Sequence, residues 1–127
     1  MNINADGLVG TIDIGPRDVE HWRECTIAMR AGGFSAEYIC SVRDKELRHF
    51  LSQLDEALAR LGQAVSFEFR AMERGFAFEI EMGRGGHVDG KYRFERDWRG
   101  PCLSGSFTAD QTHLSAWVRE LRSELAT

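Results

Sequence analysis

Residues 85–114 read GGHVDGKYRFERDWRGPCLSGSFTADQTHL, and they carry the signals for two strands and for the start of a helix. The stretch begins with a glycine turn, and two segments follow in which apolar and polar residues alternate. This alternation is typical of strands with one buried face. The inward positions are Val88, Gly90, Tyr92 and Phe94 and, after a polar loop, Leu103, Gly105 and Phe107. Because consecutive strands joined by a short connection pair antiparallel, the stretch predicts a hairpin.

The same stretch ends on signals for the start of a helix. Thr108 and Gln111 match a capping box, in which the two side chains satisfy one another's backbone donors. Asp110 adds negative charge at the positive end of the helix. An apolar stripe follows at Leu114, Trp117, Val118, Leu121 and Leu125. The pattern predicts a closing amphipathic helix.

Towards the N-terminus, a second helix is predicted from Asp44, a good N-cap residue, to a stop at Gly62. Its apolar stripe consists of Leu47, Phe50, Leu51, Leu54, Leu58 and Leu61. Strand periodicity lies on both sides of this helix, over residues 8–14, 22–30, 34–42, 65–71 and 76–82. The turn signal Ala31-Gly32-Gly33 joins two of these strands into a hairpin.

The resulting order is three strands, a helix, four strands and a helix, which differs from the strict alternation that builds a parallel sheet. We therefore expect a single α+β domain over residues 1–127. It should be a twisted antiparallel sheet of about six to seven strands with both helices packed on one face. The other face should be wet, and its side chains are Glu68, Arg70, Glu79, Glu81, His87, Asp89, Lys91 and Arg93.

The composition of the 127-residue chain indicates which kinds of partner and which cellular location to expect. Its net charge of -4 disfavours nonspecific binding to nucleic acid and suits a basic partner. No apolar run approaches the roughly 20 residues that cross a membrane, and the N-terminus lacks the pattern of a signal peptide. The three cysteines form no Cys-x-x-Cys pair, and Cys25 and Cys40 lie in phase with apolar neighbours, as small buried hydrophobes do. We expect a reducing, cytoplasmic location.

No motif for catalysis or for a cofactor stands out. Residues 83–86 join two strands, whereas a phosphate-binding loop joins a strand to a helix. Ser104 and Ser106 lie within a strand, away from the strand-to-helix turn that a hydrolase nucleophile needs. The four histidines stand singly, with no pair that could chelate a metal from one element. We expect no catalytic residue, no metal ion and no cofactor.

Two residues keep a functional interpretation open. His87 with Glu79 or Glu81 on a neighbouring strand could serve as acid and base in a nuclease-like reaction. A solvated face of alternating charges is the commoner explanation of such a pattern. Trp98 is either an exposed anchor for a protein partner or a cap on the edge of the core.

Several of these features resemble a known family. A glycine before His87-Val88, the glycine at 90, a strand ending in an aromatic residue, and Asp110-Gln111-Thr112 at the start of the closing helix are similar to the WapI-like immunity protein family. The predicted helix with Leu47, Phe50 and Leu54 resembles the family's central helix. The resemblance runs from about residue 34 to residue 125. It implies no contact role for its motif residues, which are Gly86, His87, Gly90, Asp110, Gln111 and Thr112.

Members of this family are typically encoded beside bacterial toxins, and the founding type blocks a toxin that cleaves RNA. The resemblance implies a cytoplasmic protein that neutralises a cognate toxin by protein contact. Candidate contact residues are Glu68, Glu79, Glu81 and Asp89, which would complement a basic surface, together with His87 and Trp98. Two alternatives stay open: a small hydrolase that uses His87 with a nearby carboxylate, and a structural protein that self-associates, for example as a homodimer.

Overall fold

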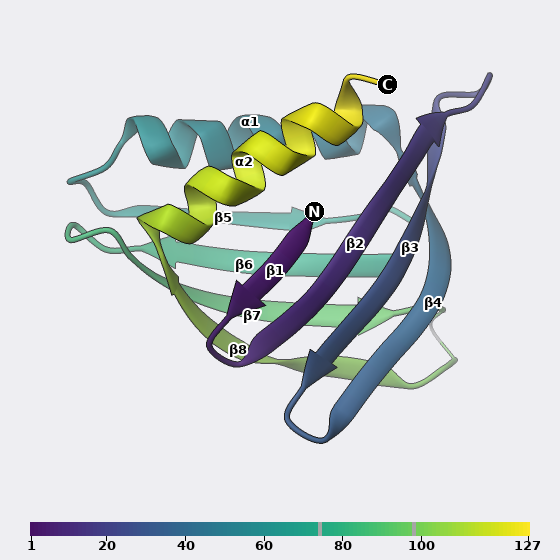
Figure 1. Cartoon of the computed structure of the whole chain (residues 1–127), viewed down its shortest axis with the longest axis horizontal. Coiled ribbons are helices and arrows are strands. Elements are labelled where there is room, and N and C mark those ends of the chain that lie inside the picture. The colour runs from purple at the N-terminus through teal and green to yellow at the C-terminus, as the bar shows by residue number, and fades with distance from the viewer. Residues whose placement is uncertain (74, 98) are drawn as a thin grey trace.

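The computed structural model describes residues 1–73, 75–97 and 99–127, and it places eight strands and two helices in them. The first four strands form one antiparallel sheet in the order β1-β2-β3-β4, and the last four form a second in the order β5-β6-β7-β8 (Figure 1). The first sheet contains β1 (Asn2–Ala5), β2 (Leu8–Arg17), β3 (Trp22–Ala31) and β4 (Phe34–Arg43). Helix α1 (Asp44–Ala59) leads to β5 (Val65–Arg70), β6 (Gly75–Met82), β7 (His87–Glu95) and β8 (Cys102–Asp110), and α2 (Gln111–Leu125) closes the chain.

The α+β class and both helices are confirmed, but the prediction of one sheet of six to seven strands is wrong. Strands β4 and β5, which α1 separates along the chain, do not pair, so the strands divide into two sheets. The short strand β1, which has only four residues, escaped the sequence pattern. In Figure 1 the strands of the first sheet run obliquely to those of the second.

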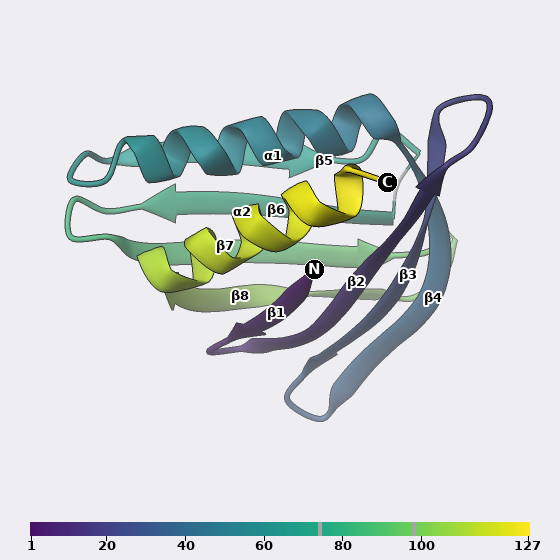
Figure 2. The ribbon, with the colours of Figure 1, turned by 45° about the horizontal axis from the view of Figure 1, so that its top comes forward.

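One backbone bridge joins the two sheets beyond their own ladders. Asp6, just after β1, donates its N–H to the Thr108 carbonyl at 3.1 Å and accepts the Thr108 N–H at 2.9 Å. On the other side, α1 connects β4 to β5 and packs against both strands. Helix α2 packs on α1 and against β1, β2 and β8, so both helices lie on the inner side of the sheets (Figure 2).

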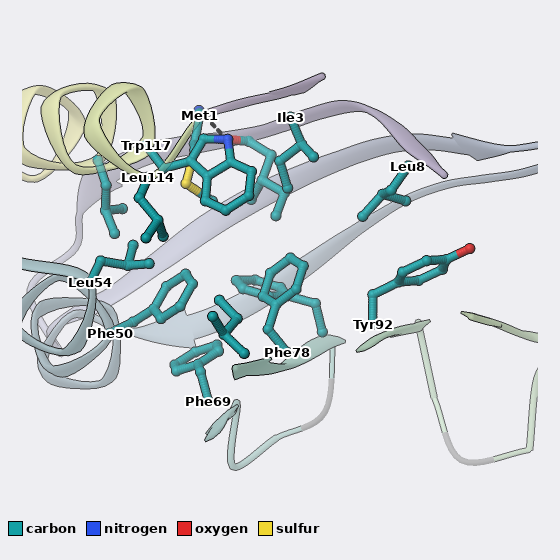
Figure 3. Packing of buried hydrophobic residues seen from close by; sticks show 14 of the residues in the cluster. Met1, Ile3, Leu8, Phe50, Leu54, Phe69, Phe78, Tyr92, Leu114 and Trp117 are labelled. Atoms are coloured by element: carbon teal, nitrogen blue, oxygen red, sulfur yellow. Dashed lines mark hydrogen bonds between the residues drawn. The ribbon is translucent and has the colours of Figure 1, made fainter. Parts of the chain in front are cut away.

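A single apolar core fills the space that the sheets and helices enclose. Phe50 and Leu54 from α1, Phe78 from β6, and Leu114 and Trp117 from α2 point towards one another (Figure 3). The rings of Phe50 and Phe78 stack with their centroids 5.7 Å apart. The aromatic positions of β6, β7 and β8 all face this core, as their alternation predicts.

Both predicted helix caps are displaced by one or two residues. Asp44 is the first helical residue of α1, while Arg43 takes the cap position and donates its N–H to Glu46 Oε2 at 3.3 Å. Asp110, rather than Thr108, caps α2, because β8 extends to Asp110 and the backbone of Thr108 is already engaged in the bridge. Helix α1 ends at Ala59, short of Gly62, and leaves Leu61 exposed.

A candidate partner-binding face on the second sheet

The outer face of the β5–β8 sheet carries the charged residues that the alternation assigned to it. All eight of the predicted wet-face side chains are exposed. The strand register arranges them in rows across the sheet, because antiparallel partners on one face stand side by side. One row is Ser66, Glu81, Asp89 and Thr108, the next is Glu68, Glu79, Lys91 and Ser106, and the third is Arg70, Ala77, Arg93 and Ser104.

The register places carboxylates directly opposite one another in two of these rows. Glu81 stands opposite Asp89, and Glu68 stands opposite Glu79. Opposed side chains on one face are about 5 Å apart at Cβ, a separation at which like charges repel. We call these four residues the acidic face. Each opposed pair lowers the stability of the sheet, and in the row of Glu68 and Glu79 the opposite charge of Lys91 offsets part of this loss.

The charge of the acidic face is only partly neutralised. Glu68 pairs with Arg70 at 3.4 Å, and Asp89 contacts His87 at 3.2 Å. Glu79 and Glu81 take part in no ion pair within residues 1–73, 75–97 and 99–127. Lys91 stands opposite Glu79 in the register, whereas the residues opposite Glu81 are Ser66 and Asp89, neither of which is basic.

A surface hollow of about 400 Å³ lies over part of this face. Glu79, Glu81 and Asp89 line it, and Asp6 adds a further carboxylate from the bridge between the sheets. Lys91 is the one basic residue among those that line it. The hollow therefore offers a predominantly negative recess that a basic side chain of a partner could enter.

Sequence reasoning missed Asp6 as a member of this surface. It lies far from the second sheet along the chain, and the two-bond bridge to Thr108 holds it against β8. The pair Asp6-Gly7 does carry a local signal, because Gly7 has a positive φ of 102° and forms the turn between β1 and β2. That signal places a turn but does not say which sheet the turn will touch.

His87 lies at the start of β7, on the outer face. Its Nε2 is 3.2 Å from Asp89 Oδ1, and in the register it stands opposite Asp110. The His87 and Asp89 side chains are 63% and 66% exposed, and His87 is absent from the lining of the 400 Å³ hollow. The structure thus brings His87 to a carboxylate, Asp89 rather than Glu79 or Glu81, but in open solvent, where little is done to exclude water from a reaction.

The motif residues of the closing block meet where β7, β8 and α2 come together. Gly86 has a positive φ of 84°, and a Cβ there would lie 2.9 Å from Gln111 Oε1. A Cβ on Gly90 would lie 2.1 Å from the ring of Phe107. Asp110 Oδ1 accepts the backbone N–H of Thr112 at 2.9 Å. Each of these contacts serves packing or capping.

Other candidate chemistry finds little support in the described part of the chain. No group of three or more His, Cys, Asp or Glu side chains in those residues is placed to hold a metal ion. None of the helices there is long and apolar enough to cross a membrane. Trp98, the candidate anchor, lies outside the described residues.

Comparison with known proteins adds one finding. The family model described as the Immunity protein WapI-like family matches residues 11–127, which is most of the chain. No curated protein and no solved structure matches.

Proposed function

The chain belongs to the WapI-like immunity protein family, and from this membership we propose that it neutralises a cognate bacterial toxin by binding it, with the acidic face as the contact surface. Family membership favours a role in binding over one in catalysis. The proposal places the protein in the cytoplasm, where a producing cell would need protection.

The observation that carries the choice of surface is the two opposed pairs of carboxylates, in which Glu79 and Glu81 take part in no ion pair among the described residues. Glu79 stands opposite Glu68, and Glu81 stands opposite Asp89. Like charges in directly opposed positions lower stability, so a contact made outside the fold is the better explanation of their presence. A toxin that cleaves RNA needs basic groups to bind a polyanion. The acidic face would cover such groups, speed association by electrostatic attraction and keep RNA away.

The test is coexpression with the toxin gene adjacent to this chain's own gene. We expect growth to be rescued and a complex to be recovered by size-exclusion chromatography. Neither rescue nor a complex would show that the proposed function is wrong.

Charge reversal then tests the surface. The double substitution Glu79→Lys with Glu81→Lys should weaken binding at least about tenfold, mostly through slower association at low salt. The control is Glu24→Lys with Glu37→Lys, which makes the same change in net charge on the exposed face of the first sheet. Binding that is weakened equally by both double variants would contradict the acidic face as the contact surface.

The contact between His87 and Asp89 is the one observation that favours an enzyme. Imidazole and carboxylate together can transfer protons near neutral pH. If the chain itself cleaves RNA, the purified protein should do so without a toxin, and His87→Ala should abolish that activity. If the chain only binds, His87→Ala should leave rescue from the toxin largely intact.

A further inference from the structure

Cys25 in β3 and Cys40 in β4 stand directly opposite each other across the first sheet's hairpin. Opposed residues in an antiparallel pair have Cα atoms about 4.5–5.5 Å apart, which falls within the range of about 4.4–6.8 Å that disulfides span. Both side chains lie on the inner face of the sheet, and both are free thiols. The backbone therefore already fits a cross-strand disulfide.

Only one of the two thiols is accessible. Cys25 is completely buried, whereas Cys40 is partly exposed beside a hollow of about 510 Å³ that Trp22, Ser41 and Arg96 help to line. Gly75 keeps room for the sulfur, because a Cβ there would lie 2.9 Å from Cys40 Sγ. A small reagent arriving from solvent would meet Cys40 first.

The pKa values of the two thiols are also shifted in opposite directions. A hydrogen bond from the Cys25 thiol lowers the pKa of Cys40, despite the opposing effect of burial. The same interaction together with burial raises the pKa of Cys25. The exposure of Cys40 and the burial of Cys25 therefore make Cys40 the attacking group and Cys25 the resolving one, and a lowered pKa of Cys40 favours the thiolate that attacks.

We propose that Cys25 and Cys40 form a dithiol site that is oxidised to a disulfide by small disulfides such as oxidised glutathione. The Cys40 thiolate attacks one sulfur of glutathione disulfide, a new S–S bond forms, and the first glutathione leaves as a thiolate. Cys25 then attacks Cys40 Sγ, which releases the second glutathione as a thiolate, and this thiolate takes up the proton that the Cys25 thiol loses. The protein loses two electrons and two protons, and one glutathione disulfide becomes two thiols.

The second step is aided by the first. Once Cys40 is bound to glutathione, it is no longer a thiolate, so the largest cause that raises the pKa of Cys25 is removed, although burial still raises it. The Cys25 sulfur already lies on the inner side of the new bond, opposite the solvent from which glutathione came. The mixed disulfide should therefore be short-lived.

The experiment uses the full chain with Cys102→Ser, which removes the exposed third thiol. After incubation with oxidised glutathione and acid quenching, intact mass should show the loss of two hydrogen atoms with no glutathione attached. Peptide mapping should then link Cys25 to Cys40. The melting temperature should rise, because the new bond closes a loop in the unfolded chain.

Two further variants identify the order of attack, each in the Cys102→Ser background and each checked for folding by circular dichroism. Cys25→Ala should stop at a stable glutathione adduct on Cys40, and Cys40→Ala should take no adduct. A folded Cys102→Ser chain that keeps both thiols, or that holds a lasting adduct on Cys40, would overturn the proposal. No toxin enters this test, so its outcome is independent of the proposed function.

Discussion

The Nε atom of Arg23 lies 2.6 Å from Oδ1 of Asp44, and both side chains are shielded from solvent. Arg23 comes from β3 and Asp44 from α1, so the pair fastens a helix to the first sheet. Arg23 also donates to the carbonyl of Gly15 at 3.0 Å and to that of Leu125 at 3.2 Å. The carbonyl of Leu125 belongs to the end of α2, which carries partial negative charge. One buried guanidinium thus ties both helices to the sheet.

Replacing this guanidinium should be costly. In Arg23→Met, Asp44 would remain buried with its charge met mainly by Arg48, at 2.8 Å. Breaking a buried ion pair by removing one partner typically costs about 3–5 kcal/mol, and here Asp44 would lose the partner that is itself buried. We expect the free energy of unfolding, measured in urea, to fall by this amount.

An exposed ion pair provides the control. Arg122 and Asp55 join α2 to α1 at 3.0 Å, but both side chains are more than half exposed. Surface pairs contribute at most about 1 kcal/mol, so Arg122→Ala should have a small effect. Similar losses in the two variants would show that the Arg23 pair is worth no more than a surface contact.

Stability should also depend on the protonation of Asp44. Burial raises the pKa of Asp44, but hydrogen bonds from Arg48 and Arg23 and their charges outweigh it and hold the pKa below its ordinary value. A group whose pKa is lower when folded stabilises the protein above its unfolded pKa, about 3.9, and this contribution is lost as pH falls through the folded pKa. Urea denaturation should show stability declining below about pH 4. The decline should be shallower in Asp44→Asn, and an unchanged slope would contradict this assignment.

Local periodicity is enough to find the helices and most of the strands. Apolar residues at every second position indicate a strand with one face on the core, and apolar residues three or four positions apart indicate a helix with one face on the core. Local periodicity is not enough to divide the strands between sheets. Whether β4 pairs with β5 depends on where α1 lies, which no local pattern contains. The sequence does allow the prediction that Cys25 and Cys40 stand opposite each other. Both stand at equal distances from the turn at Gly32-Gly33, so a two-residue hairpin loop brings them face to face.

Gly90 tests whether packing determines a motif position. Its Cβ would lie 2.1 Å from Cζ of Phe107, so Gly90→Ala should cost about 1–3 kcal/mol through overpacking. Gly85→Ala is the matched control, because no heavy atom lies within 4 Å of a Cβ there. Adding Phe107→Leu to Gly90→Ala should recover part of the loss. If Gly90→Ala unfolds at the same urea concentration as Gly85→Ala, the ring contact does not limit the site.

The residue that caps α2 is Asp110 in the structure, whereas the sequence pattern predicts Thr108. Asp110 Oδ1 accepts the N–H groups of Thr112 at 2.9 Å and His113 at 3.3 Å, so Asp110→Ala should cost about 0.5–2 kcal/mol. Thr108→Val keeps the β-branched shape and the backbone bridge, and it should cost less. The melting temperatures of both variants test this assignment. A larger loss of stability in Thr108→Val would indicate that Thr108 is the cap residue, as the sequence pattern predicts.

The site was less predictable than the fold for a physical reason. The alternation of apolar and polar residues assigns Glu68, Glu79, Glu81 and Asp89 to one face. It does not determine which residue of the neighbouring strand stands opposite each of them. Register does that, and it depends on the turns at both ends of each strand. His87 shows the consequence, since its contact is Asp89 on its own strand and not a glutamate of β6.

The opposed carboxylates of the acidic face should lower the stability of the free protein. Glu81 stands opposite Asp89 and makes no ion pair in the described residues, so Glu81→Gln should raise the free energy of unfolding by about 0.2–1 kcal/mol. The gain should shrink in high salt, which screens exposed charges. Glu37→Gln is the control, because Glu37 is exposed but stands opposite the uncharged Ala28. Destabilisation by Glu81→Gln, or an equal gain in the control, would mean that the opposed carboxylates do not repel. The strain would then no longer argue for a partner.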